Sequence, residues 1–187
     1  MSLEKNKKVL LDVPYYSQYL HVTDDFWKPR ACGIVCLKMV MERFNEIDLT
    51  IDDLIKRANK KGGFGEYGWI HDFLIELAQE SGFSACRKEW KSETLIIQEN
   101  LIEDAINEFV ENLSLGYPVI VSTAKSFSEI NKFHHVLLTG FEVKNGSPWG
   151  FYYHDPDSLN EESGKHNFVP INTFKNYWRK LAIYVKI

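Results

Sequence analysis

The hydrophobic periodicity of the chain changes near Gly116, and this change constrains the fold more than any other feature of the sequence. Before Gly116, apolar residues recur every three to four positions, as in helices that bury one face. After Gly116, short segments rich in β-branched and aromatic residues are bounded by turn formers, as in strands. A helical N-terminal half packed on a C-terminal, mostly antiparallel sheet is therefore expected, which is an α+β fold.

Local signals predict where the helices of the first half begin and end. Thr50 and Asp53 have the spacing of a capping box, which begins a helix. Gly82 and Gly116 follow apolar helical patterns and are suited to the left-handed conformation that ends a helix. The helices should cover residues 32–44, a short segment from Thr50 to about 60–65, about 69–81, and 101–113.

The second half should contain short strands joined by tight connections. Asn145 and Gly146 favour a hairpin turn between two of these strands. Asn172 should cap a short helix before the last strand, and Pro14 restricts an early extended segment to a sheet edge. Strands are expected at residues 9–16, 117–122, 133–143, 151–154 and 181–187.

Composition limits the class of protein. The chain has 187 residues with no linker or repeat, so we expect one domain over residues 1–187, which at this length buries roughly 70% of its unfolded surface. A net charge of −4 argues against nucleic acid as a partner. No segment approaches the ~20 apolar residues of a membrane span, so no membrane insertion is expected. Cys32, Cys36 and Cys86 are too few for a disulfide framework, which favours reduced thiols and a cytoplasmic location.

Two patterns that suggest a cofactor lack the context that it needs. Gly63, Gly65 and Gly68 match the G-x-G-x-x-G spacing of a dinucleotide-binding turn, but a helix end and not a buried strand precedes them. Cys32 and Cys36 lie four residues apart and could join histidines of the second half in a metal site, but Cys36 falls within an apolar stripe. We therefore expect no cofactor and no metal.

A different set of residues favours nucleophilic catalysis. Cys32 lies at the expected start of a helix, where unpaired amides and the helix dipole lower the pKa of a thiol. His134 could take the thiol proton and Asp155 could hold the imidazole, because the two residues flank the expected hairpin. Gln18 and the backbone N–H of Cys32 could bind a developing oxyanion. Each residue also has a structural alternative, as a small core thiol, a buried core histidine, a turn former or a loop amide.

The order of these residues resembles that of a known family, the papain-like cysteine peptidases related to the bacteriocin leader (double-glycine) processing peptidases. The resemblance spans nearly the whole chain. It rests on the sequences LDVPYYSQ at residues 11–18, ACG at 31–33, LKMV at 37–40, GWIH at 68–71, GYPVIV at 116–121, HHVLLTG at 134–140 and DP at 155–156. It also includes the closing aromatic segment, residues 174–178.

The resemblance implies a papain-like cysteine peptidase fold and a role for each matching residue. Gln18 would support the oxyanion hole, Cys32 would be the nucleophile, His134 the base and Asp155 the residue that orients the base. The family usually has an aromatic residue after the histidine, whereas this chain has His135, so the choice of base between the two histidines stays open. Strand alternation predicts that only one of them faces Cys32.

These observations predict a cysteine hydrolase, either a peptidase or an amidase, whose substrate contains a peptide or amide bond. One alternative is an acyl- or aminoacyl-transfer enzyme, because an amine can resolve the same acyl-enzyme in place of water. The other alternative is a non-catalytic module that keeps the fold and uses its cleft to bind a peptide. Competent residue types at all four positions favour the enzyme.

Overall fold

The computed structural model describes residues 4–45, 48–66, 68–129 and 132–187. The helices are α1 (Cys32–Phe44), α2 (Ile51–Lys60), α3 (His71–Glu80), α4 (Leu95–Ser114), α5 (Glu161–Gly164) and α6 (Ile171–Tyr177), with 3-10 turns η1 (Lys28–Arg30) and η2 (Lys125–Phe127). The strands are β1 (Asn6–Leu10), β2 (Phe64–Gly65), β3 (Gly68–Trp69), β4 (Ser84–Glu89), β5 (Val119–Ala124), β6 (Phe133–Lys144), β7 (Ser147–His154), β8 (Asn167–Pro170) and β9 (Trp178–Lys186).

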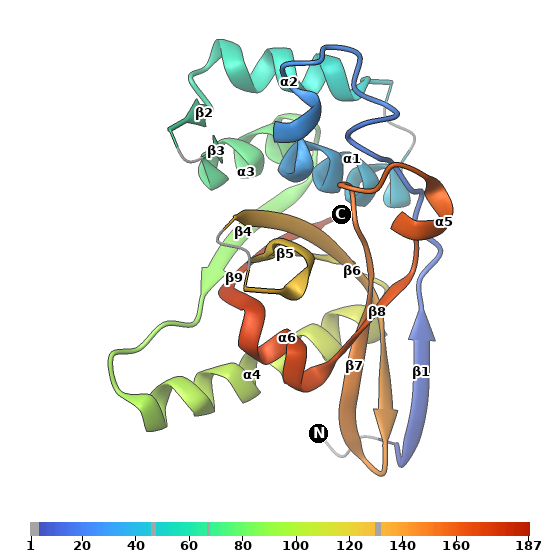
Figure 1. The fold of residues 1–187 in the computed structure, drawn as a ribbon, viewed down its shortest axis with the longest axis vertical. Helices are drawn as coiled ribbons and strands as arrows, with labels where there is room; N and C mark the ends of the chain where they lie inside the picture. Colours follow the sequence, from blue (N-terminus) through green and yellow to red (C-terminus); the bar gives the residue numbers. More distant parts are fainter. Residues whose placement is uncertain (1–3, 46–47, 67, 130–131) are drawn as a thin grey trace.

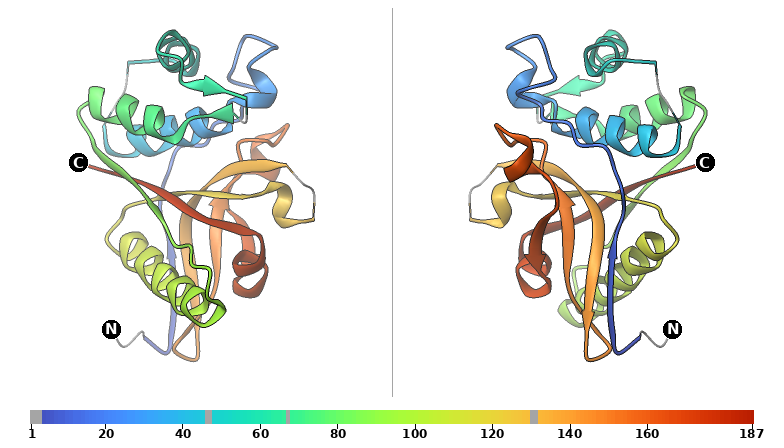
Figure 2. Two further views of the ribbon diagram at one scale, coloured as in Figure 1. Left: turned by 90° about the vertical axis from the view of Figure 1, so that its left-hand side faces the viewer. Right: turned by 90° about the vertical axis from the view of Figure 1, so that its right-hand side faces the viewer.

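A twisted antiparallel sheet lies between two layers of helices (Figures 1 and 2). Within the described ranges, seven strands form this sheet in the order β4-β9-β5-β6-β7-β8, and β1 pairs with the far end of β6. Helices α1 to α3 cover one face of the sheet, and α4 and α6 cover the other. The helical N-terminal part packed on a C-terminal antiparallel sheet confirms the α+β class.

Alternation along the central strands produces one hydrophobic core on each face of the sheet. In β5, Ile120 packs with the core of α1 to α3, whereas Val119 and Val121 pack with the core of α4 and α6. In β6, Leu137 faces the first core and Val136 faces the second. A strand buried on both faces therefore reads as a continuous apolar run, as the sequence of β5 and β6 does.

Most of the predicted helices are confirmed. Helix α1 has the expected bounds, and Thr50 and Asp53 form both hydrogen bonds of the capping box at α2. Gly82 and Gly116 follow α3 and α4 with φ of 88° and 89°, the left-handed conformation that ends a helix. The hairpin turn is also present, because Asn145 and Gly146 have positive φ between β6 and β7.

Several predictions were wrong in detail. Strand β1 covers Asn6–Leu10 and ends before Pro14, so the expected strand at 9–16 is largely a loop. Pro170, without a side-chain hydrogen bond, precedes α6, so Asn172 lies inside the helix and does not cap it. Gly65 and Gly68 pair in the small β2–β3 hairpin, where a loop was expected. Strand β4 was missed because its side chains are mostly exposed, and Arg87, Lys88 and Glu89 are charged.

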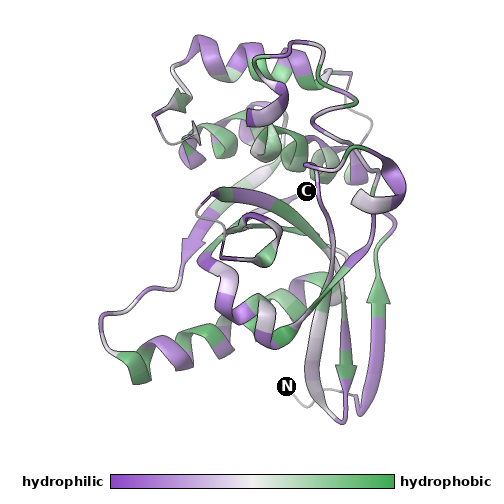
Figure 3. Ribbon diagram, in the orientation of Figure 1, coloured by the Kyte–Doolittle hydropathy of each residue, from purple (hydrophilic) through white to green (hydrophobic). Residues whose placement is uncertain are grey.

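Helix α4 begins six residues before the predicted start. Its first turn carries Leu95, Ile96 and Ile97, which are 80%, 72% and 51% exposed, so these side chains do not follow the buried stripe that starts near Leu101. Figure 3 shows this hydrophobic end of α4 projecting away from the sheet. Although α4 is the longest helix of the described segments, none of those helices meets the length and apolarity needed to cross a membrane.

Replacing Gly140 by Ala should destabilise the pairing of β1 with β6. A Cβ at this position would lie 2.2 Å from the carbonyl oxygen of Val9, and backbone cannot move as a flexible side chain can. We expect Gly140→Ala to lower the free energy of unfolding by about 2 kcal/mol, measured by urea denaturation. Gly65→Ala is the control, because its nearest neighbours would be 3.7 Å away. Equal urea midpoints for both variants would contradict this prediction.

Candidate active site

The thiol of Cys32 lies at the first residue of α1, next to His135 of β6. The residue before it, Ala31, makes no side-chain cap, and the first turn of the helix contains no acidic side chain. Trp69 donates a hydrogen bond to the carbonyl of Arg30 over 2.8 Å and stacks on Trp27, so the β2–β3 hairpin braces the turn that leads into α1. The helix N-terminus is thus fixed, and its free amides favour a thiolate at Cys32.

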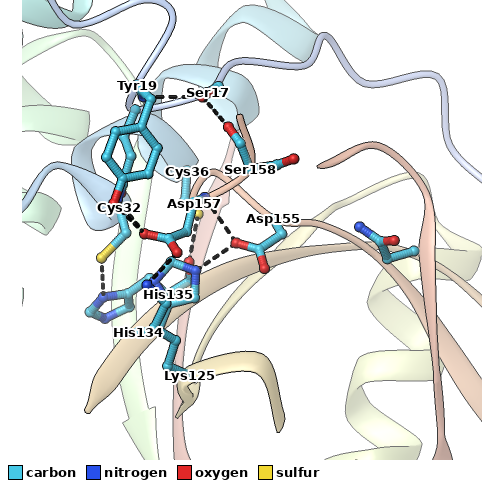
Figure 4. A network of polar contacts seen from close by, with 12 residues as sticks. Ser17, Tyr19, Cys32, Cys36, Lys125, His134, His135, Asp155, Asp157 and Ser158 are labelled. Atoms are coloured by element: carbon cyan, nitrogen blue, oxygen red, sulfur yellow. Dashed lines mark hydrogen bonds and ion pairs between the residues drawn. The ribbon is translucent and has the colours of Figure 1, made fainter. Parts of the chain in front are cut away.

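Two neighbouring imidazoles act on this partly exposed thiol (Figure 4). Burial favours the neutral thiol, but hydrogen bonding to His134 and His135 outweighs it and holds the pKa of Cys32 well below its usual value. The Sγ of Cys32 lies 3.8 Å from Nδ1 of His135. The expectation that only one histidine faces the thiol was therefore wrong. At this end β6 pairs with β5, and its pairing with β7 begins only at Leu137.

Asp155 holds His134, as the hairpin predicted. Nε2 of His134 lies 2.7 Å from Oδ1 of Asp155, which leaves Nδ1 as the nitrogen available to the thiol. Burial alone would lower the pKa of His134, but the hydrogen bonds to Asp155 and Cys32 raise it to about 10. Burial likewise opposes ionisation of Asp155, yet His134 and the backbone N–H of Asp157 keep the pKa of the carboxyl below its usual range. The structure thus favours an imidazolium between two anions.

Gln18 is buried in the same network and binds the loop that carries Asp155. Its Nε2 donates to Oδ1 of Asp157 over 2.6 Å, and its backbone N–H donates to the carbonyl of Pro156. Its Oε1 has no partner among the described side chains and backbone. Asp157 also accepts from Tyr19 and pairs with Lys125 at 2.5 Å. One amide hydrogen of Gln18 is thus committed to Asp157, and the other is available to an oxyanion.

Sequence reasoning missed two parts of this site. Asp157 links Gln18 to the Asp155 loop, and the only signal for it was its position in the Asp-Pro-Asp sequence. His71 contacts His135 with 3.2 Å between the two Nε2 atoms, and it had appeared only as part of a motif before a helix. Across the described part of the chain, no group of three or more His, Cys, Asp or Glu side chains has an arrangement that could hold a metal ion.

A cysteine at a helix N-terminus, facing histidine on an antiparallel sheet, defines the class of papain-like cysteine peptidases. The sequence matches the Peptidase_C39 like family over residues 10–184. The chain therefore belongs to that family and is a cysteine peptidase. Comparison with curated proteins found no significant match.

Solved structures share this fold at low sequence identity. A chain described as a C39-like peptidase from Bacillus anthracis is 21% identical with a TM-score of 0.66, over 97% of this chain and 98% of that one. The peptidase domain of Streptococcus ComA, a bifunctional ABC transporter of a quorum-sensing pathway, is 18% identical with a TM-score of 0.56, over 84% and 92%. A double-glycine-motif protease of an AMS/PCAT transporter, in complex with its leader peptide, is 15% identical with a TM-score of 0.57, over 95% and 94%.

Proposed function

We propose that this chain hydrolyses peptide or amide bonds with Cys32 as nucleophile, His134 as general base and acid, and Asp155 as the residue that orients His134. Gln18 and the backbone N–H of Cys32 bind the oxyanion. The observation that carries this proposal is the 2.7 Å contact of His134 with Asp155, next to a thiol whose pKa both imidazoles lower. The complex of a structural neighbour with a leader peptide supports a peptide as the substrate.

The reaction proceeds in two steps that balance protons and charge. The Cys32 thiolate attacks the carbonyl carbon, the oxyanion forms, and the His134 imidazolium gives its proton to the departing amine. Water then attacks the thioester, His134 takes a proton from that water, and the carboxylic acid product leaves as the thiolate is restored. We propose that residues 1–187 act as one catalytic unit in this reaction. Reduced thiols and a thiolate nucleophile fit a cytoplasmic location.

Limited alkylation with iodoacetamide tests the nucleophile. At pH 6 to 7, we expect Cys32 to react about tenfold or more faster than Cys86, although Cys86 is more exposed, because alkylation requires the thiolate. Cys36 should react last, because it is buried and burial raises its pKa. Peptide mass mapping of quenched samples measures the three rates. Faster labelling of Cys86 than of Cys32 would favour the non-catalytic, peptide-binding alternative.

Hydrolysis itself is tested with a library of peptides whose cleavage is followed by mass spectrometry. The unmodified protein should release new amino termini, and Cys32→Ala should release none. Cys86→Ser is the matched control, because it removes an exposed thiol on β4 and should keep full activity. Equal cleavage by the Cys32→Ala variant and the unmodified protein would overturn the proposal.

A further inference from the structure

His135 contacts the Cys32 thiol, and His71 in turn contacts His135. Nδ1 of His135 lies 3.8 Å from the Cys32 sulfur, and Nε2 of His135 lies 3.2 Å from Nε2 of His71. The rings of His71 and His135 meet edge to face, with centroids 5.1 Å apart. The proposed hydrolytic mechanism assigns no role to either side chain, although His135 contacts the nucleophile and His71 contacts His135.

The chemistry of the three groups fixes which of them donates. A thiolate can only accept a hydrogen bond, so Nδ1 of His135 must carry a hydrogen when it faces the Cys32 anion. In its neutral form His135 has one N–H, so its Nε2 then has a lone pair and accepts. His71 must therefore donate from its own Nε2–H across the 3.2 Å contact. The negative charge on the Cys32 sulfur thus sets the direction of both hydrogen bonds, from His71 to His135 and from His135 to Cys32.

We propose that His135 donates a second hydrogen bond to the Cys32 thiolate and that His71 is a positioning residue that holds His135 in the donating tautomer. This inference rests on the proposed function of Cys32 as nucleophile. The added hydrogen bond lowers the pH at which the Cys32 thiolate becomes protonated. The arm formed by His135 and His71 is separate from the arm formed by His134 and Asp155, which supplies the base.

Packing confines the His135 ring to this position. His135 is 8% exposed and lies between α1 and α3. A Cβ at Gly33 would lie 3.5 Å from Nδ1 of His135 and 3.1 Å from Cδ1 of Leu74, so the ring and α3 fill the space that glycine leaves. The backbone of His135 is held as well, because Cys36 Sγ donates to its carbonyl over 3.6 Å. A ring held this tightly keeps one orientation toward the sulfur.

The charges around His71 keep it neutral, as the proposed tautomer requires. Burial, followed by the charges of Arg87 and Arg179, lowers the pKa of His71 to about 4, against a smaller opposing effect of Glu89. Arg87 and Glu89 face it from β4, Arg179 from β9 and His135 from β6. The groups that face the Cys32 thiol are the two imidazoles of β6, one of them paired with Asp155. His71 is therefore a neutral donor above about pH 5.

Loss of this arm should leave a signature that a merely structural role would not produce. A thiolate that loses one hydrogen bond has a higher pKa, so the acid limb of its alkylation rate should move up by about one pH unit. Its anion also becomes the stronger nucleophile, with a Brønsted slope of about 0.4–0.5, so the rate at the alkaline plateau should rise about threefold. Slower reaction in acid and faster reaction in alkali are expected together.

The test measures iodoacetamide labelling of Cys32 from pH 4 to 9 by mass mapping, with Cys86 of the same molecule as the reference thiol. His71→Leu should show the shifted limb and the higher plateau. His71→Gln keeps an N–H donor near the place of Nε2 and should restore the unmodified profile. His135→Asn keeps a donor near the place of Nδ1 whose hydrogens need no tautomer, so its profile should stay within about 0.3 pH units of the unmodified one.

The double variant His71→Leu with His135→Asn makes the test specific. Because an amide donor does not depend on His71, the His71→Leu change should have no further effect in this background. A pH profile of His71→Leu that overlays the unmodified profile would overturn the inference, as would a full one-unit shift in His135→Asn. Where His71→Leu fails to fold by circular dichroism, the His135→Asn profile decides.

The same data separate this inference from the proposed function. Fast labelling of Cys32 in the unmodified protein, with no change in His71→Leu, would leave the nucleophile in place and remove only the second arm. Labelling of Cys32 no faster than Cys86 in the unmodified protein would overturn the nucleophile itself. Peptide cleavage that depends on Cys32 is expected with the first result and not with the second.

Discussion

Replacement of His134 by Ala is expected to lower kcat for peptide cleavage about 10³-fold, because the reaction then lacks its general base and acid. The fast labelling of Cys32 near neutral pH should slow as well, since His134 makes the largest favourable contribution to the lowered pKa of the thiol. Both effects come from one side chain, which contacts Asp155 at 2.7 Å. Initial rates on a cleaved peptide and the alkylation rate at pH 6.5 are the measurements.

His135→Ala is the matched control for the loss of kcat, although its Cys32 labelling near neutral pH should slow as well. The two histidines are consecutive and nearly equally buried, at 4% and 8% exposed, so loss of core packing should affect both variants similarly. Because His135 has no carboxylate partner, its replacement should leave kcat at pH 8 within about tenfold of the unmodified protein. Loss of activity in His135→Ala, with activity retained in His134→Ala, would reverse the assignment of the base.

The sequence predicts the pair His134 and Asp155 beside Cys32, but it does not predict the pair His135 and His71. The reason lies in how each pair is brought together. Cys32 could be placed because the helix over residues 32–44 shows a clear apolar period. His134 and Asp155 could be placed together because a hairpin with an Asn-Gly turn joins their strands. Local periodicity and one turn are enough to bring these three residues to one region.

The contact of His71 with His135 depends on tertiary packing alone. The two residues are 64 positions apart, and they meet because α3 packs on α1, β4 and β9, which brings its first residue to His135 of β6. No sequence period encodes that packing. The hydrogen bond from Gln18 to Asp157 could not be predicted either. Asp157 lies in an irregular turn, and no strand or helix pattern sets the direction of that turn. The edge strand β4 was missed because its side chains are largely exposed, and β8 was missed because it has only four residues, of which Val169 is the buried one.

Gln18→Ala should lower kcat about 10²-fold with little change in KM, because the lost N–H stabilises the oxyanion in the transition state more than the substrate carbonyl. The fold should survive, since Asp157 keeps its contacts with Lys125 and Tyr19. Cys32 labelling should also survive, because alkylation forms no oxyanion. Gln98→Ala is the control, because Gln98 lies in α4 on the other face of the sheet and also makes two hydrogen bonds. An unchanged kcat in Gln18→Ala would remove this residue from the oxyanion site, whereas parallel losses of kcat and labelling would show that Gln18 supports the nucleophile.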